Sequence, residues 1–283
     1  MTAASLHNPL ISVVVATRNA ADTISRCMDS IVGQDYENWE IVVSDGSSTD
    51  GTIDKVKEYA ESHCVTWQSS PDTGIAQAWN RALHLVWGDW VLFLGSDDRL
   101  HDNHVFARMA PFLLTAKPEY RVVYGQVQLI EPDGHYLGNF GEPWALARKR
   151  FTNVMSVPHP GCFHRRLLFS ELGYFDESFH VAVDYEFLLR ELPVHDALFV
   201  SGIIVTDMQT GGVSNTSWRA SLLEARRASR AHGSKYPGMP WLSSFCYNII
   251  NTGLRRMLST TGYNRLRNLK RKVGRHLGGG GVA

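Results

Sequence analysis

The sequence predicts an α/β fold in which helices flank both faces of a mostly parallel β-sheet. Short runs of β-branched and apolar residues recur along the first 110 residues, and each is followed by a polar loop. Segments with apolar residues spaced three and four apart lie between these runs, as in helices with one buried face. Because parallel neighbours are joined by crossover connections, this alternation favours a sheet covered on both sides.

The first unit consists of a strand, a loop and a helix. Residues 10–16 are apolar and β-branched, which is typical of a buried parallel strand, and the polar residues 17–19 end it. Asp22 is in position to cap the helix that follows. The apolar residues expected on the buried face of this helix are Ile24, Cys27, Met28, Ile31 and Val32.

The same alternation continues through three more strands. A second strand at residues 39–43 is followed by a turn-rich loop at residues 45–51 and by a second helix. Residues 64–67 form a weaker third strand, and the helix after it is expected to end at Gly88. Residues 90–94 then form a strong fourth strand.

Three polar clusters, at residues 17–19, 45–50 and 95–98, fall where predicted strands end. Ligands of parallel α/β sheets bind at the carboxyl ends of strands, so we expect the clusters to meet in one crevice. Asp97 and Asp98 directly follow a buried strand, and paired carboxylates suit a hard divalent cation such as Mn²⁺ or Mg²⁺. Adjacent aspartates also occur as helix caps and in solvated turns, so the pair alone leaves these alternatives open.

The chain is predicted to have three parts. Residues 1–110 carry the regular alternation, whereas residues 111–215 are irregular, with a hairpin at about residues 122–137, and are expected to form the other wall of the crevice. Residues 216–283 form a basic extension with the pattern of an amphipathic helix. Its apolar positions, three to five residues apart for the most part, are Trp241, Leu242, Phe245, Ile249, Ile250, Leu254 and Leu258.

Charge is distributed unevenly along a chain whose formal net charge is zero. Residues 1–215 contain 15 Lys and Arg against 27 Asp and Glu, a balance of 15 − 27 = −12, whereas residues 216–283 contain 13 against 1, a balance of +12. The basic extension therefore fits either an anionic membrane surface or packing on the acidic body, and its periodicity is the same in both cases. Because the extension is rich in apolar as well as basic residues, we do not expect nucleic acid as its partner.

Composition and cysteine spacing are those of an ordinary globular protein of a reducing compartment. The four cysteines are far apart and form no C-x-x-C pair, which indicates neither a zinc site nor a disulfide framework. The first ten residues lack the pattern of a signal peptide, and no apolar run is long enough to span a membrane. We therefore expect a cytoplasmic protein, with peripheral attachment to the inner face of the cell membrane as an option.

Seven segments carry a resemblance to a known family. They are SVVVATRN at residues 12–19, EIVVSDGSSTDGT at 40–52, SPDTGIAQAWNRA at 70–82, GDWVLFLGSDD at 88–98, HPGCFHRRLL at 159–168, LGYFDESF at 172–179 and VAVDYEFLLR at 181–190. In this order they resemble the family 2 glycosyltransferases, whose catalytic domain has the GT-A fold. The resemblance covers roughly residues 10–215 and implies that residues 1–110 bind a nucleotide sugar and residues 111–215 face the acceptor.

The resemblance also implies roles for individual residues. The donor's base, ribose or phosphates would be contacted by Thr17, Asn19, Asp45, Arg81 and Asp97. The metal motif matches the acidic pair, with Asp98 the direct ligand and Asp97 assisting.

Asp184 matches the general base that activates the acceptor hydroxyl, although the residues after it have helical spacing and allow a helix cap instead. His159 is an acceptor-side candidate. The pairs His101/His104 and His159/His164 lack further zinc ligands, so these histidines are expected at the surface or on the acceptor side. Where the family often has an aromatic residue and an acidic residue, this chain has Arg18 and Val183.

The implied function is inverting transfer of a sugar from a nucleotide-diphosphate donor to a hydroxyl of a saccharide or lipid-linked acceptor. The Q-x-x-R-W signature of processive members is absent from the sequence, which favours transfer of one sugar per encounter. Cell-surface polysaccharide or glycolipid synthesis is the expected setting. Two alternatives remain at this point: a nucleotidyltransferase, and a non-catalytic nucleotide-sugar-binding or membrane-associated scaffold protein.

Overall fold

A computed structural model describes residues 8–131, 133–211 and 218–234. These residues belong to the first of two units into which the chain divides, Met1–Tyr236. The amphipathic pattern at residues 241–258 lies outside the described residues. No helix in the described part of the chain is long and apolar enough to cross a membrane.

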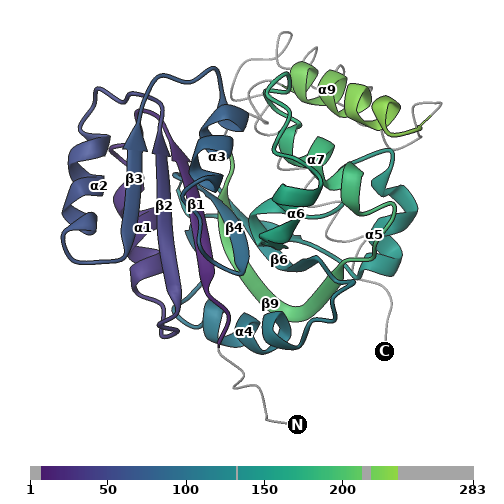
Figure 1. Cartoon of the computed structure of the whole chain (residues 1–283), viewed down its shortest axis with the longest axis horizontal. Helices are drawn as coiled ribbons and strands as arrows, with labels where there is room; N and C mark the ends of the chain where they lie inside the picture. The colour runs from purple at the N-terminus through teal and green to yellow at the C-terminus, as the bar shows by residue number, and fades with distance from the viewer. Residues whose placement is uncertain (1–7, 132, 212–217, 235–283) are drawn as a thin grey trace. The chain divides into compact units, whose positions relative to one another are not determined.

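The described strands form one sheet, in the order β3-β2-β1-β4-β8-β6-β9-β5, with β7 paired to β6 (Figure 1). The first four strands along the chain lie parallel to one another. The strands are β1 Ile11–Thr17, β2 Trp39–Asp45, β3 Val65–Ser69, β4 Trp90–Gly95, β5 Arg99–Leu100, β6 Val122–Ile130, β7 Tyr136–Phe140, β8 Cys162–Arg165 and β9 Leu198–Gln209.

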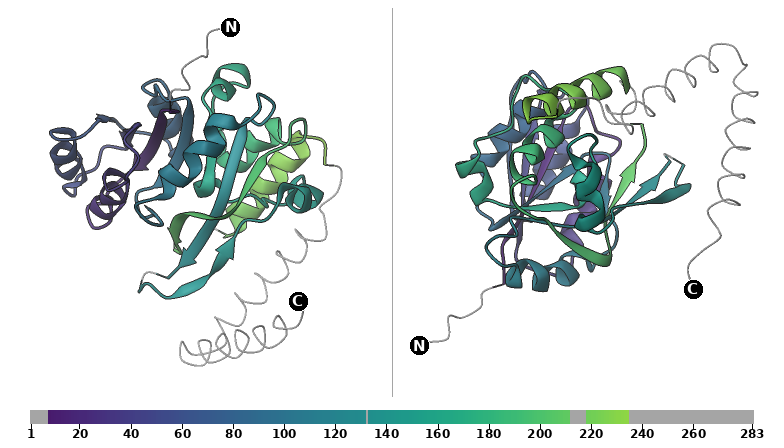
Figure 2. Two further views of the ribbon diagram at one scale, coloured as in Figure 1. Left: turned by 90° about the horizontal axis from the view of Figure 1, so that it is seen from below. Right: turned by 90° about the vertical axis from the view of Figure 1, so that its right-hand side faces the viewer.

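Helices cover both faces of the sheet (Figure 2). One face packs against α1 Ile24–Val32, α2 Thr52–Ala60 and α4 Val105–Thr115. The other packs against α3 Ile75–Leu83, α5 Trp144–Phe151, α6 Leu167–Glu171, α7 Val183–Glu191 and α9 Trp218–Ala231.

Strand alternation explains the two cores. In β1, Val14 belongs to the core on the α3 side, whereas Val13 and Val15 belong to the core with α1 and α4. Successive side chains of a strand point to opposite faces, so a fully apolar strand supplies both cores at once. The structure confirms the predicted α/β class.

Two predicted helix ends are wrong. The first helix begins after Thr23, whose side chain makes no cap hydrogen bond, so Asp22 is not its cap. The third helix ends at Leu83 rather than Gly88. Beyond it the chain crosses the start of β1, where the Gly88 amide donates to Ser12 Oγ at 2.8 Å and to buried Glu40 at 3.1 Å. A Cβ atom on Gly88 would lie 2.4 Å from Ser12 Oγ, so the close approach requires glycine.

The second half of the chain contributes to the same sheet. The predicted hairpin is present as antiparallel β6 and β7. Strand β8 lies antiparallel between β4 and β6, and β9 runs parallel to β6, so this side of the sheet is mixed. Helix α9, the described part of the predicted extension, belongs to the same unit as the sheet and packs against α7 (Figure 1).

Candidate active site

The carboxyl ends of three parallel strands meet at one edge of the sheet. Thr17, the last residue of β1, pairs with Asp45 at the end of β2, and Ala16 pairs with Gly95 at the end of β4. The chain continues from Gly95 into Asp97 and Asp98. The strand register therefore brings together the polar clusters that the sequence analysis placed in one crevice.

Asp45 is buried, with 1% of its surface exposed, and its carboxylate is held by neighbours. Its oxygens accept hydrogen bonds from the Ser48 amide at 2.9 Å, from Ser69 Oγ at 2.6 Å and from the Ser48 hydroxyl. A buried carboxylate needs such partners, and these fix its orientation at the strand end. Its contact with a donor stays a prediction.

Thr17 and Asn19 are placed differently from each other. The Thr17 hydroxyl is buried and has no hydrogen-bond partner among the described residues, which is a costly state that a bound ligand or water would relieve. Asn19 adopts a left-handed backbone conformation with φ of 50°. Its amide donates to Ser48 Oγ at 2.7 Å and its Oδ1 accepts from the Thr49 amide at 3.0 Å. Asn19 thus joins the loops after β1 and β2, and its donor contact stays a prediction.

Arg81 holds the loop that follows β3. Its guanidinium donates to Ser70 Oγ at 2.6 Å, to the Ser70 carbonyl at 3.2 Å and to Gln77 Oε1 at 3.1 Å. Asp72, in the same loop, was missed by the sequence analysis. A Cβ atom on Gly46 would lie 2.6 Å from Asp72 Oδ2, so Asp72 lies against the loop after β2. Its place in the SPDTG motif was the available signal.

The two carboxylates after β4 converge on one point. A Cβ atom on Gly95 would lie 2.8 Å from Asp98 Oδ2 and 2.9 Å from Asp97 Oδ1, so glycine leaves both oxygens room. The Gln209 amide at the end of β9 donates to Asp98 Oδ1 at 2.9 Å. Arg26 donates to the Asp97 carbonyl and to Gln209 Oε1, both at 2.6 Å. The acidic pair, which follows β4 in the chain, is thus also held by α1 and β9.

The electrostatics of the pair fit a divalent cation. Burial, and next to it the charge of Asp97, raises the pKa of Asp98 to about 7. A cation between the two carboxylates would relieve both the desolvation and the repulsion, and hard oxygen ligands suit Mn²⁺ or Mg²⁺. Among the described residues no group of three His, Cys, Asp or Glu side chains is arranged around one metal position. A cation here would complete its coordination with diphosphate oxygens and water, as Mg²⁺ commonly does.

Asp184 lies in the first turn of α7, whose N-cap is Ala182, so its interpretation as a helix cap is wrong. Its side chain is 26% exposed, and its Oδ2 lies 4.0 Å from His159 Nδ1. Its Oδ1 accepts a hydrogen bond from the Tyr185 amide at 2.8 Å. Burial raises the pKa of Asp184 to about 6, which suits a base that must be ionised yet reactive near neutral pH.

His159 is a buried neighbour of Asp184. It is 5% exposed, and its ring lies 5.4 Å from the ring of Phe93 on β4 and 5.2 Å from that of Trp79 on α3. Burial lowers the pKa of His159 to about 3, so the ring is neutral at pH 7. Phe93 lies two residues before Gly95, and this contact therefore brings Asp184 to the carboxyl half of the strand that ends in the acidic pair.

The other histidines divide into surface and buried groups. His101 pairs with buried Asp207 at 2.6 Å and His104 with Asp35 at 2.5 Å, both near the surface as expected. His164 is fully buried with Nδ1 3.3 Å from the Val91 carbonyl, so its expected surface or acceptor-side position is wrong. It lies on β8, which is covered on both faces.

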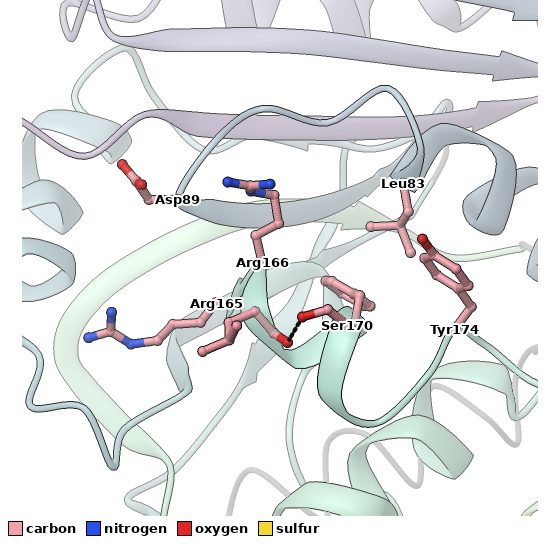
Figure 3. Close-up of a pocket in the computed structure, with 8 residues that line it drawn as sticks. Leu83, Asp89, Arg165, Arg166, Ser170 and Tyr174 are labelled. Atoms are coloured by element: carbon pink, nitrogen blue, oxygen red, sulfur yellow. Dashed lines mark hydrogen bonds between the residues drawn. The ribbon is translucent and has the colours of Figure 1, made fainter.

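A cavity of about 360 Å³ lies elsewhere in the molecule. Asp89 and Arg166 line this cavity and lie at the start of β4, where Trp90 pairs with Arg165. The cavity is therefore at the amino end of β4, opposite to the strand ends that carry Asp97 and Asp98. Figure 3 shows Arg166, Leu83 and Tyr174 around this space. None of the predicted site residues lines it; the candidate site lies at the carboxyl strand ends instead.

The fold and the acidic pair at its strand ends define an α/β enzyme of the GT-A type. Residues 12–170 match the family model for glycosyl transferase family 2. The chain therefore belongs to this family and is a glycosyltransferase, which sets aside the nucleotidyltransferase and scaffold alternatives.

Curated relatives agree with this family, and solved structures agree with its fold. A "PGL/p-HBAD biosynthesis glycosyltransferase" of Mycobacterium tuberculosis is 30% identical over 212 residues, which are 74% of this chain and 80% of the relative. The structure of S. aureus TarS 1–349 in complex with UDP-GlcNAc is similar, with a TM-score of 0.65 and 20% identity over 80% of this chain and 68% of that one. The mannosyltransferase PcManGT from Pyrobaculum calidifontis, solved with GDP-Man and Mn²⁺, gives a TM-score of 0.60 and 20% identity over 94% of this chain and 80% of that one.

Proposed function

We propose that this glycosyltransferase moves one sugar per encounter from a nucleotide-diphosphate donor to an acceptor hydroxyl, with inversion at the anomeric carbon. The observation that carries the proposal is the placement of Asp184. Its partly exposed carboxylate, of raised pKa, lies beside His159. The His159 ring in turn stacks on Phe93 of β4, the strand that leads into Asp97 and Asp98. One strand thus supports an acidic pair suited to a diphosphate-bound cation and a separate acid suited to proton transfer.

Donor binding is assigned to the strand ends. The unpaired hydroxyl of Thr17 and the fixed carboxylate of Asp45 lie at the ends of neighbouring strands, in position to contact a nucleoside. Asp98, assisted by Asp97, would hold the divalent cation. When bound, the cation supplies charge stabilisation to the departing nucleoside diphosphate. The UDP-GlcNAc and GDP-Man in the two similar structures support a nucleotide sugar as the donor class.

Proton transfer is assigned to Asp184. Its carboxylate removes the proton of the acceptor hydroxyl while that oxygen forms a bond to the anomeric carbon and the bond from sugar to diphosphate breaks. The leaving diphosphate keeps the electron pair, and protonated Asp184 later releases its proton to solvent. A single displacement of this kind inverts the anomeric configuration.

The setting is proposed from the relatives. Because mycobacterial relatives carry the name "PGL/p-HBAD biosynthesis glycosyltransferase", we assign this chain to glycolipid or cell-surface polysaccharide synthesis. A lipid-linked or saccharide acceptor follows from that assignment. The basic extension would then attach a cytoplasmic enzyme to the inner face of the membrane where such acceptors lie.

The test is a donor panel with product analysis. UDP- and GDP-linked hexoses and N-acetylhexosamines are offered in Mn²⁺ buffer with octyl glycosides as acceptors, and nucleotide release is measured. NMR of the product from the best pair should show the anomeric configuration opposite to that of the donor. A product of retained configuration, or Mn²⁺-independent release at the full rate, would contradict the proposal.

A further inference from the structure

The loop that leads into α7 is anchored from two sides. On one side lies α3, where Asn80 donates to the Phe175 carbonyl at 3.0 Å and accepts from the Phe175 amide at 2.9 Å. Gln77 on the same helix donates to Glu177 at 3.1 Å. These contacts fix the start of the loop, residues 175–177, but none of them reaches its end, where α7 and Asp184 begin.

The end of this loop is held by a single carboxylate from α9. Glu224 accepts hydrogen bonds from three consecutive backbone amides: His180 at 3.0 Å, Val181 at 2.7 Å and Ala182 at 3.0 Å. Ala182 is the N-cap of α7, and its own side chain makes no cap hydrogen bond. The amides at a helix start lack intrahelical partners and favour negative charge. Glu224 therefore anchors the chain at the N-terminus of α7, including the N-cap amide, from 42 residues further along the sequence.

A second residue of α9 also binds the same loop. Arg227 donates to the Ser178 carbonyl at 2.7 Å, and its guanidinium lies 3.6 Å from the centre of the Phe179 ring. Arg227 follows Glu224 by three positions, so both side chains project from one face of α9. This face is the one that meets the loop preceding Asp184.

Ser229 near the end of α9, and His232 just after that helix, contact the N-terminal part of α7 itself. Ser229 Oγ lies 3.1 Å from Tyr185 Oη, and His232 Nε2 lies 3.0 Å from the carboxylate of Glu186. Tyr185 and Glu186 are the two residues after Asp184. Figure 1 shows α9 next to α7, as these contacts require. Helix α9 thus contacts the chain on both sides of Asp184.

We propose that Glu224 is a positioning residue that sets the location of the Asp184 carboxylate. The inference rests on the proposed role of Asp184 as the base. Proton transfer requires the base within hydrogen-bond reach of the acceptor hydroxyl, and a displacement of about 1 Å can cost about 100-fold in rate. Three charge-assisted hydrogen bonds to consecutive amides limit such displacement at the start of α7. Glu224 is the only acidic residue after position 215, so no neighbour in that part of the sequence can replace it.

Substitutions in the full-length chain separate the positioning role of Glu224 from its contribution to the stability of the fold. Glu224→Ala removes the acceptor oxygens, yet alanine favours the helical conformation of α9. Glu224→Gln keeps one acceptor oxygen at the same reach. Leu223→Ala alters the preceding, 63% exposed residue and is the matched control. Turnover and KM are measured with the donor and octyl glycoside that give the fastest nucleotide release, and calorimetry gives the affinity for UDP or GDP in Mn²⁺.

We expect Glu224→Ala to lower kcat by about 10- to 100-fold, with nucleotide affinity within about twofold of wild type. Glu224→Gln should recover most of this loss, and Leu223→Ala should behave as wild type. A merely structural role would lower the melting temperature and leave kcat unchanged below it. That outcome, or equal losses in the Gln and Ala variants, would overturn the proposal.

Two further variants keep the outcomes distinct. Should Glu224→Ala fail to fold, Glu224→Asp withdraws the carboxylate by one methylene while keeping its charge, and full turnover of this variant would equally refute the inference. Asp184→Asn is assayed in parallel. If Asp184→Asn is fully active, the proposed role of Asp184 is wrong; if it is inactive and Glu224→Ala is fully active, only the positioning role of Glu224 is wrong.

Discussion

Asp184→Asn is expected to abolish transfer while leaving the donor site intact. The substitution keeps the size of the side chain but removes its basic oxygen. Loss of a general base costs about 10²- to 10⁴-fold in rate, so kcat should fall by that amount. Nucleotide affinity in Mn²⁺ should stay near the wild-type value, because the donor contacts are assigned to the ends of β1, β2 and β4.

The pKa of Asp184 adds a second, independent signature. Burial raises this pKa to about 6, and the base works in its ionised form, so activity should rise with pH through 6 and level off above 7. About 90% of the groups are ionised at pH 7 and about 10% at pH 5, which gives an approximately tenfold fall in kcat/KM for the acceptor. Saturating donor and Mn²⁺ keep the Asp97 and Asp98 pair ionised over this range, so the acid limb reports Asp184.

The assay is continuous nucleotide release at pH 5 to 8 with the best octyl glycoside acceptor, for wild type and Asp184→Asn. Asp54→Asn is the matched control, because Asp54 is an exposed aspartate paired with Lys57 on α2. Its profile should coincide with wild type. Wild-type turnover by Asp184→Asn, or an unchanged acid limb in the residual activity of that variant, would refute the reasoning.

The remaining predictions concern the cation, the core and the extension. Asp98→Asn should weaken calorimetric binding of UDP or GDP in Mn²⁺ by about tenfold or more, and chelator should weaken wild-type binding equally; unaltered binding in both cases would remove the metal assignment. Gly88→Ala should lower the free energy of unfolding in urea by about 1–3 kcal/mol, because its Cβ would lie 2.4 Å from Ser12 Oγ. An unchanged unfolding midpoint would show that the start of β1 moves to make room for the methyl group at no cost in stability. Replacing Trp241 and Phe245 by serine should reduce sedimentation with anionic vesicles, and equal sedimentation would favour packing on the body.

Local patterns predicted the fold of the first 110 residues because its determinants are local. The strands β1, β2 and β4 are short apolar runs bounded by polar loops, and parallel crossovers follow from their alternation with helices. Helix ends were less accurate, since they depend on distant contacts. Gly88, where the end of α3 was expected, instead contacts Ser12, which lies 76 residues away in sequence.

The same distinction applies to the candidate site. Asp97 and Asp98 were predictable because they directly follow a strand, and Asp184 and His159 because they stand in family motifs. Gln209, which donates to Asp98, carried no signal: it lies 111 residues from its partner, and its position depends on the pairing of β9 with β5 and β6. Glu224 carried a weak signal as the one acidic residue of a basic segment, but the sequence did not indicate what it contacts.

The contacts of α9 also bear on how the two functions of the site are divided. The acidic pair is fixed by β4, β9 and α1, all packed within the sheet and its helices. Asp184 is carried on α7, whose N-terminus depends on a carboxylate from a helix that follows the last strand of the sheet. We therefore expect a change in α9 to perturb the proposed base without altering the proposed donor site.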